Sequence, residues 1–386
     1  MGETIIEGVT NIALNGNGRA VITHADAPPS SRTRPLGPRR VTTVADLRAV
    51  LADDVPDVML AGTFHVSAPV MLARIAERNI STEPGAMIQS NGDDFRILTL
   101  ADGKGGRLTI NGLVIDGGWH LNPGECPTDD AANFFLPNLE HLRMLGCTTR
   151  YSRRTGIFAT HTGVLILRNC VGFAMPRDFC WTNGSLDVLI ENCDVWHCGD
   201  DGIGCHVEPG TTDANRTVVI RNNRLYDTLG IKVLGGGRKI LIEGNSGTAP
   251  AFYGIRLGID PETGEGAGTQ RNITVRGNTL ENVRITSPCH PGQEQGVWLF
   301  MYAQPKDKSQ PPYSVENVVI DGNNLVRTPD NGRLLSSAYS WADIGAYSKT
   351  AFLPQARLDI GTEAQRYVCK NPGDIIGTNT MTGFTK

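Results

Sequence analysis

Three aspartates carry the strongest chemical signal in the sequence. Asp178 is followed 22 residues later by Asp200 and then directly by Asp201. If one structural repeat separates them, Asp178 and Asp201 lie on neighbouring repeats, and repulsion between like charges raises the pKa of at least one carboxyl group. Paired carboxylates act as acid and base when a glycosidic bond is hydrolysed. Calcium binding, or a polar turn capped by backbone amides, would use the same three residues.

A row of aromatic, small and basic residues is expected beside these acids. Taking the same position of a recurring Gly-plus-apolar strand in successive repeats yields Phe158, Trp181, Gly204, Lys232, Arg256 and Trp298. We expect Gly204 to leave a gap over the acids. Trp181 and Trp298 would flank it, because indole faces stack on sugar rings.

Basic residues complete the candidate substrate-binding set. Lys232 and Arg256 are expected on one side of the gap, where they could hold carboxylate or sulfate groups. His206, four residues after Gly202, should reach the same face, and Arg177 directly precedes the first acid. A mixed, solvated sheet face is the alternative interpretation of this whole row.

A repeating phrase indicates how these residues are positioned. Two or three β-branched or Leu residues are followed by a polar residue and then by Asn or Gly, as in Val188–Asn192 and Val218–Asn222. The shortest steps between copies are 22 or 23 residues. A second phrase, Gly followed by an apolar strand, begins ten residues after the Asn or Gly that ends the first phrase, at Gly156, Gly202 and Gly254. Two phrases at a fixed offset predict stacked coils, with the longer steps carrying inserted loops.

The residue after each Asn or Gly marker predicts an internal ladder. These residues are Cys147, Cys170, Cys193, Asn223, Asn245, Asn278 and Asn323. Stacked coils place equivalent side chains about 4.8 Å apart, so the asparagines can hydrogen-bond from coil to coil and the thiols can fill the same inward site. Metal binding by the cysteines is the alternative. The nine cysteines form no Cys-x-x-Cys pair, which favours reduced thiols.

Composition agrees with a turn-rich β architecture. Among 386 residues there are 45 glycines, while aromatic residues make up only 6%. The net charge of −4 provides no reason to expect nucleic acid or an anionic membrane as partner. The apolar runs are strand-sized and far shorter than a bilayer span requires.

The ends of the chain differ from its middle. We expect an N-terminal arm or linker over residues 1–43, a parallel β-helix over 44–326, and a C-terminal cap or assembly segment over 327–386. Val44–Leu51 has helical spacing and is expected to cap the first coil. Met1–Ala20 shows no secretion signal. The compartment therefore stays open, and secretion or a place in a virion are both compatible with the sequence.

The acid motifs resemble those of the polygalacturonase family, glycoside hydrolases within the pectin-lyase-like β-helix group. That family has Asn-Thr-Asp, then Gly-Asp-Asp one coil later, then Gly-His-Gly and Arg-Ile-Lys. This chain has Pro176-Arg177-Asp178, Gly199-Asp200-Asp201 and Gly254-Ile255-Arg256-Leu257-Gly258. Gly258 stands where the family has Lys, and Thr228-Leu229-Gly230 lacks the His. The resemblance covers Leu108–Asn324 and implies an all-β, right-handed parallel β-helix.

The resemblance also implies roles for these residues. The expected activity is inverting hydrolysis of an acidic oligo- or polysaccharide, with no cofactor. Asp200 would be the general acid, and Asp178 and Asp201 would activate a water molecule. Arg256 would hold an acidic sugar next to the cut, with Lys232 replacing the missing cation.

Two other functions remain open at this point. A polysaccharide lyase or C5-epimerase on the same fold would use Lys232 and Arg256 to neutralise the uronate and His206 as base. Ca²⁺ would be a candidate cofactor for a lyase. Alternatively, the chain is a glycan-binding phage tail fibre or spike, and the two end segments would then assemble a homotrimer.

Overall fold

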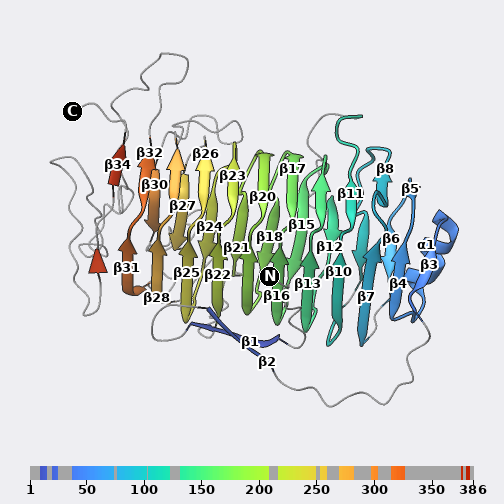
Figure 1. Ribbon diagram of the computed structural model, residues 1–386, viewed down its shortest axis with the longest axis horizontal. Helices are drawn as coiled ribbons and strands as arrows, with labels where there is room; N and C mark the ends of the chain where they lie inside the picture. Colours follow the sequence, from blue (N-terminus) through green and yellow to red (C-terminus); the bar gives the residue numbers. More distant parts are fainter. Residues whose placement is uncertain are drawn as a thin grey trace, which may run out of the picture.

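The computed structural model describes residues 9–14, 20–24, 37–73, 76–101, 103–121, 131–207, 216–248, 253–258, 269–281, 297–302, 314–326, 375–376 and 380–382. In these residues the chain winds repeatedly through three long parallel sheets, which we call sheets 1, 2 and 3 in the order in which each coil visits them (Figure 1). All sheet pairings between coils are parallel, as expected for a β-helix.

Sheet 1 contains twelve strands in the described residues: β3 (Arg39–Val41), β4 (Asp57–Leu60), β7 (Glu77–Thr82), β10 (Arg107–Asn111), β13 (His141–Leu145), β16 (Val164–Arg168), β19 (Asp187–Glu191), β22 (Thr217–Arg221), β25 (Lys239–Glu243), β28 (Thr269–Arg276), β31 (Ser314–Asp321) and β33 (Ile375–Ile376). Sheet 2 contains, over the same described part, β5 (Thr63–Val66), β8 (Met87–Ser90), β11 (Val114–Asp116), β14 (Thr148–Arg150), β17 (Val171–Met175), β20 (Asp194–Cys198), β23 (Arg224–Tyr226), β26 (Ser246–Thr248), β29 (Thr279–Glu281), β32 (Asn324–Val326) and β34 (Thr380–Thr382). Sheet 3 contains β6 (Val70–Leu72), β9 (Leu98–Leu100), β12 (Ala132–Phe135), β15 (Thr155–Thr160), β18 (Cys180–Asn183), β21 (Ile203–His206), β24 (Ile231–Leu234), β27 (Tyr253–Gly258) and β30 (Val297–Tyr302).

The interior is filled by alternate residues of each strand. On sheet 1, Leu165, Val188, Val218 and Ile240 lie in one row across four coils, and each is fully buried. Successive side chains of a strand point to opposite faces, so only every second residue enters this core. The core therefore runs the length of the stack as parallel rows of aliphatic side chains.

The marker residue of the repeating phrase has a conformational reason. Gly146, Asn169, Asn192, Asn222 and Gly244 all have φ between 54° and 63°. Glycine adopts this left-handed region without cost, and asparagine tolerates it better than most residues. The chain can therefore leave sheet 1 and enter sheet 2 by the same tight turn in coil after coil.

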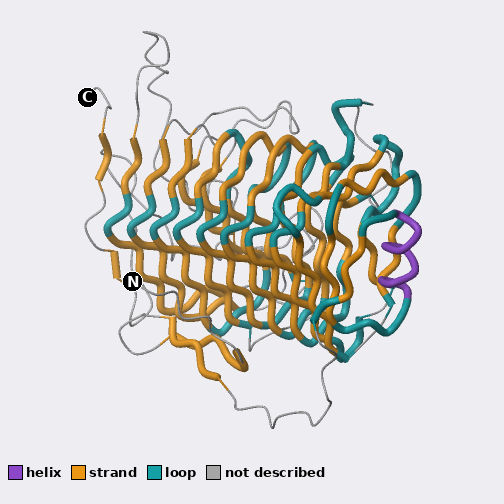
Figure 2. Tube along the Cα trace, turned by 45° about the vertical axis from the view of Figure 1, so that its right-hand side comes forward, coloured by secondary structure: helices purple, strands orange, loops and turns teal. Residues whose placement is uncertain are grey.

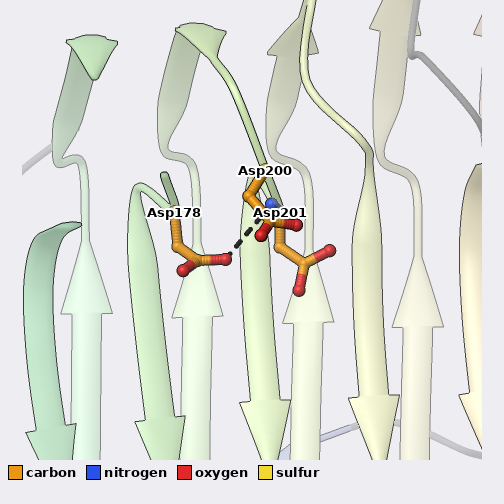
Figure 3. A group of neighbouring side chains, drawn as sticks. All are labelled: Asp178, Asp200 and Asp201. Carbon is orange, nitrogen blue, oxygen red and sulfur yellow. Dashed lines mark hydrogen bonds between the residues drawn. The ribbon is translucent and has the colours of Figure 1, made fainter. Parts of the chain in front are cut away.

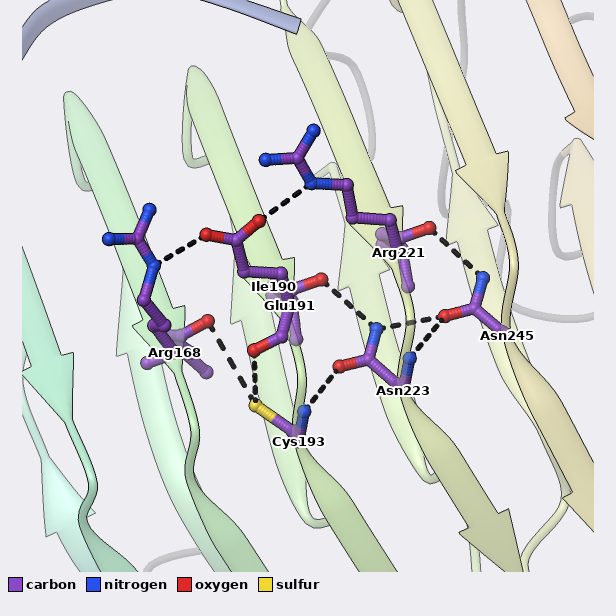
Figure 4. Close-up of polar contacts among 9 residues, drawn as sticks. Arg168, Ile190, Glu191, Cys193, Arg221, Asn223 and Asn245 are labelled. Carbon is purple, nitrogen blue, oxygen red and sulfur yellow. Dashed lines mark hydrogen bonds and ion pairs between the residues drawn. The ribbon is translucent and has the colours of Figure 1, made fainter. Parts of the chain in front are cut away.

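The predicted ladder lies directly after this turn. Asn223 Nδ2 donates to Asn245 Oδ1 at 2.9 Å, and Asn245 Nδ2 donates to Asn278 Oδ1 at the same distance. The backbone N–H of Cys193 donates to Asn223 Oδ1 at 2.9 Å, which joins the cysteine part of the row to the asparagine part (Figure 4). Cys147, Cys170 and Cys193 are buried free thiols, so the predicted inward register is confirmed.

The predicted cap helix is present as α1 (Val44–Ala52), purple in Figure 2. Thr43 caps its N-terminus by accepting a hydrogen bond from the Asp46 N–H at 3.1 Å. Its buried face, Leu47, Val50 and Leu51, joins the main core and covers the end of the stack. No helix in the described part of the chain is long and apolar enough to cross a bilayer.

Both predicted end segments contain more β structure than the sequence indicated. In the N-terminal arm, β1 (Val9–Leu14) and β2 (Ala20–His24) form an antiparallel hairpin, and β3 begins sheet 1 before residue 44. In the C-terminal segment, β33 pairs with β31 and β34 pairs with β32. The repeat therefore resumes after a long insertion that the fixed period could not anticipate. The rest of residues 327–386 lies outside the described part.

Candidate functional site

The three aspartates meet on the turn that joins sheet 2 to sheet 3 (Figure 3). Asp178 precedes β18, and Asp200 and Asp201 precede β21. The Asp201 N–H donates to Asp178 Oδ1 at 3.1 Å, so the two residues are neighbours on adjacent coils as the spacing predicts. One carboxylate oxygen from each of the three lies within 4.8 Å of the others. Two consecutive coils therefore concentrate three acids at one place.

Basic side chains contact two of these acids. Arg177 Nη1 lies 3.1 Å from Asp200 Oδ2, and Lys232 Nζ lies 3.2 Å from Asp201 Oδ2. His206 Nε2 is 3.6 Å from the same Asp201 oxygen. The Asp201 side chain is only 1% exposed, whereas that of Asp200 is 14% exposed. Five of the predicted site residues thus take part in ion pairs at this turn, and Asp201 is the most enclosed of the acids.

The pKa values of Asp178 and Lys232 are both raised, for different reasons. Burial raises the pKa of Asp178 well above its ordinary value, and the neighbouring Asp200 and Asp201 raise it further, while Lys232 opposes them. Burial alone would lower the pKa of Lys232, but Asp201, together with the other two acids, raises it on balance. The turn therefore favours a protonated Asp178 next to a charged Lys232.

A divalent cation fits this cluster poorly. Carboxylate oxygens are the ligands that Ca²⁺ prefers, and three of them converge here. However, an arginine already contacts Asp200 and a lysine contacts Asp201, so two of the three carboxylates have their charge compensated. A bound ion would have to displace or face both cations.

The predicted row beside the acids forms on sheet 3. Phe158, Trp181, Gly204, Lys232 and Arg256 pair in that order across five coils. The Trp181 ring stacks on Phe158, with centroids 4.5 Å apart and planes 17° apart, so one indole face is covered. A Cβ at Gly204 would lie 3.5 Å from Trp181 Cδ1 and 3.2 Å from Asp201 Oδ2. His206 Nε2 would be 3.3 Å away, so the absence of a side chain at Gly204 lets Asp201, His206 and Trp181 approach one another closely.

Trp298 does not belong to this row. Phe300 pairs with Arg256, and Trp298 precedes it by two positions in β30. Trp298 was assigned to the row because Gly296 followed by Val297 matches the recurring Gly-plus-apolar start of these strands. The observed pairing is displaced by two residues after the long insertion between β29 and β30. The side chains of β30 lie outside the described residues, so a role for Trp298 stays a prediction.

The row continues toward the N-terminus by one residue that was not predicted from the sequence. Phe135 pairs with Phe158, and their rings meet edge to face with centroids 5.2 Å apart. The Arg96 guanidinium lies 3.5 Å from the Phe135 ring centroid. In other coils, Gly followed by Ile stands at or beside the start of the sheet 3 strand, as at Gly156, Gly202 and Gly254. Ala132–Phe135 lacks this pattern, so the sequence did not indicate that this strand belongs to sheet 3.

Comparisons with known proteins agree with the architecture. Residues 128–280 match the family model described as right handed beta helix region. No curated protein sequence matches the chain. Among solved structures, the A-module of mannuronan C-5 epimerase AlgE6 from Azotobacter vinelandii is 15% identical, with a TM-score of 0.44 over 75% of this chain and 87% of that chain.

Two polygalacturonases are similar to the same degree. The family 28 exopolygalacturonase of Yersinia enterocolitica is 13% identical, with a TM-score of 0.46 over 81% of this chain and 75% of that one. The polygalacturonase of Erwinia carotovora ssp. carotovora is 12% identical, with a TM-score of 0.43 over 78% and 91%. Together with the three parallel sheets, the family-model match shows that this chain is an all-β protein with the fold of a right-handed parallel β-helix.

Proposed function

We propose that the chain is a glycoside hydrolase that cuts an acidic polysaccharide at Asp178, Asp200 and Asp201. The observation that carries this proposal is the convergence of three carboxylates with unequal surroundings. Hydrolysis of a glycosidic bond needs one protonated and one ionised carboxyl group. Environments that push two such groups toward opposite protonation states are the usual sign of a divided acid and base.

The contacts favour Asp178 as the proton donor. Its pKa is raised by burial and by the two neighbouring acids, so it holds its proton at higher pH than an ordinary aspartate. Asp200 has a guanidinium at 3.1 Å, which favours its ionised form. Asp201 is enclosed by Lys232 and His206, so we assign it a positioning role. This order differs from that implied by the resemblance, in which Asp200 is the donor.

In the proposed reaction, Asp178 donates its proton to the glycosidic oxygen as the bond from that oxygen to the anomeric carbon breaks. In one route Asp200 takes a proton from a water molecule that attacks the anomeric carbon, which inverts the configuration. In the other route Asp200 attacks this carbon itself and forms a glycosyl ester; water, deprotonated by Asp178, then displaces Asp200, and the two inversions retain the configuration. The resemblance implies inversion. Separations within 4.8 Å are nearer the about 5–5.5 Å typical of retaining enzymes than the about 6.5–9.5 Å of inverting ones. NMR of the first-formed anomer distinguishes the two.

An anionic sugar suits the charge of this site. With Asp178 protonated, Asp200 and Asp201 are contacted by Arg177 and Lys232, and Arg256 is the next residue after Lys232 in the row. We place the sugar near Gly204, at the part of the half-buried Trp181 indole that Phe158 and the His206 ring leave exposed. Lys232, the next residue in the row, would contact its carboxylate or sulfate group. No metal ion takes part in this proposal.

The test is a panel of acidic and neutral polysaccharides, in which new reducing ends are measured for the wild type and for Asp200→Asn. We expect cleavage of an acidic polymer by the wild type, unaffected by EDTA, and loss of at least about 10²-fold in the variant. Asp194→Asn is the matched control, because Asp194 pairs with Arg224 on sheet 2 and not with the cluster. Equal activity in Asp200→Asn and the wild type would refute the proposal.

A lyase or C5-epimerase is the second candidate, and one contact favours it. His206 is held beside Asp201 and next to Lys232, an arrangement in which an imidazole could remove the C5 proton of a uronate while the amine neutralises its carboxylate. A lyase would release an unsaturated product that absorbs ultraviolet light without consuming water. His206→Ala would then abolish activity, and Asp200→Asn would matter less.

A further inference from the structure

The outer face of sheet 1 carries an apolar row that the catalytic proposal does not use. Ile166, Leu189, Val219 and Leu241 pair across four consecutive coils. They alternate with the inward rows, so they point away from the interior. Nevertheless Ile166 is only 2% exposed and the other three are fully buried. Together with Val164 they form a hydrophobic cluster separate from the main core. We call these four residues the outer apolar row.

The outer apolar row is confined to these four coils. In the preceding coil the same position is Arg143, and in the following coil it is Thr274. The row beside it is charged: Glu191 accepts from Arg168 at 2.5 Å and from Arg221 at 2.6 Å (Figure 4). A solvated sheet face would be polar throughout, so four adjacent aliphatic residues of this kind require a cover.

The N-terminal hairpin provides that cover. β1 lies against β19, in the middle of the four coils, and Figure 1 draws the hairpin in dark blue beside the central strands of sheet 1. Within the described residues, β1 and β2 pair with each other and with no strand of sheet 1. The hairpin therefore lies against sheet 1 without continuing it. An isolated two-stranded hairpin is at best marginally stable in water.

We propose that the outer apolar row is a docking surface for the chain's own N-terminal hairpin, which clasps the middle of the β-helix. The connection between β2 and β3 is long enough for this. Residues 25–38 can span roughly 45 Å when extended. From β3 to β19 is six strand spacings, or about 29 Å. The hairpin is tethered to its own chain. Its effective concentration at the outer apolar row of that chain is therefore far higher than at the row of a second copy.

Hydrogen exchange of the hairpin amides tests the docking. In the full chain, Leu189→Glu places a charge in the centre of the row, and we expect the amides of Ile12 and Val21 to exchange at least about tenfold faster. Thr274→Glu is the matched control, since it lies in the same row one coil beyond the apolar four, and it should leave hairpin exchange unchanged. Unaltered hairpin protection in Leu189→Glu, or equal loss in both variants, would overturn the proposal.

A second variant keeps the test decisive if Leu189→Glu fails to fold. Deletion of residues 25–32 leaves six connecting residues, which span roughly 20 Å and cannot bridge about 29 Å. We expect the shortened chain either to associate through hairpins docked on neighbouring copies or to stay monomeric with rapidly exchanging hairpin amides. Light scattering and hydrogen exchange distinguish these results. A monomer whose hairpin remains as protected as in the full chain would contradict docking at this row.

Discussion

Two turns of the β-helix coil each repeat one residue type on successive coils, but one repeat stabilises the fold and the other opposes it. On the turn from sheet 1 to sheet 2, Asn223, Asn245 and Asn278 repeat one residue type, and each satisfies the next. On the turn from sheet 2 to sheet 3, Asp178 and Asp201 repeat a charge, and each raises the cost of ionising the cluster. Neutral amides both donate and accept, so stacking them stabilises the fold, whereas stacked carboxylates only accept and repel. A repeated position that opposes stability is the better candidate for chemistry.

The largest expected effect lies on the acid turn. Asp178→Asn and Asp200→Asn should each lower kcat by about 10²-fold or more on a polysaccharide substrate. Substrates with good leaving groups need no proton donor, so the donor variant should recover activity on them. Under our assignment Asp178→Asn recovers and Asp200→Asn does not. Recovery by Asp200→Asn instead would support the order implied by the polygalacturonase resemblance.

Substitutions on the turn from sheet 1 to sheet 2, which carries the asparagine ladder, should lower stability and leave catalysis unchanged. Asn245 Oδ1 accepts from both the side chain and the backbone N–H of Asn223, and Asn245 Nδ2 donates to Ile220 O. Asn245→Ala removes these three buried hydrogen bonds. We expect the free energy of unfolding to fall by about 1–3 kcal/mol, the cost of leaving buried polar groups without partners. Denaturant titration measures this, with Asn79→Ala as a half-buried control on the outer face. If Asn245→Ala lowered the activity per folded molecule as much as the aspartate substitutions do, the two turns would not have separate roles.

The pH dependence of stability sharpens the same comparison. Because the pKa of Asp178 is raised in the folded state, the stability it contributes is present at low pH and is lost as the pH rises through that raised value. Asp178→Asn removes this loss. The variant should therefore become increasingly more stable than the wild type as the pH rises toward neutrality. Asp194→Asn, which breaks an exposed ion pair, should show no such gain. If the difference in free energy of unfolding between Asp178→Asn and the wild type were the same at every pH, the pKa of Asp178 would not be raised in the folded state.

Trp181→Ala should weaken binding of an acidic glycan by about tenfold, because stacking on one aromatic face contributes on the order of 1 kcal/mol. Its contact with Phe158 has a similar worth, so the melting temperature should fall by only a few degrees. Phe135→Leu, two strands from Trp181 in the same row, is the control for binding. A collapse of stability without any change in binding would show that the indole serves only the sheet.

The smallest effect is expected at the cysteine part of the ladder. Cys147, Cys170 and Cys193 are at most 1% exposed, so a thiol reagent should label none of them rapidly in the native protein. Labelling in denaturant provides the reference. Rapid native labelling would contradict the inward register on which the comparison of the two turns depends.

Most of the coil architecture could be predicted because its determinants are local. A marker such as Asn192 is recognisable because few residues accept its left-handed backbone, and the inward row follows from strict alternation along each strand. The prediction was wrong where insertions interrupt the period. Phe300 and not Trp298 follows Arg256, and the strand Ile375–Ile376 was missed because Gly377 stands where the repeating phrase has a polar residue. Loop length carries no information about strand register.

The sequence by itself determined which residues form columns, and so it placed Asp178, Asp200 and Asp201 on neighbouring coils. It could not determine how the charges pair, because Lys232 reaches across a coil boundary to Asp201 while Arg177 reaches to Asp200. Nor could it show that the middle residue of an apolar triplet, such as Leu189, would be buried on the outside of the sheet. Columns follow from backbone geometry that each coil repeats. Side-chain reach and the burial of Leu189 depend on contacts between segments far apart in the chain, so only the tertiary structure decided them.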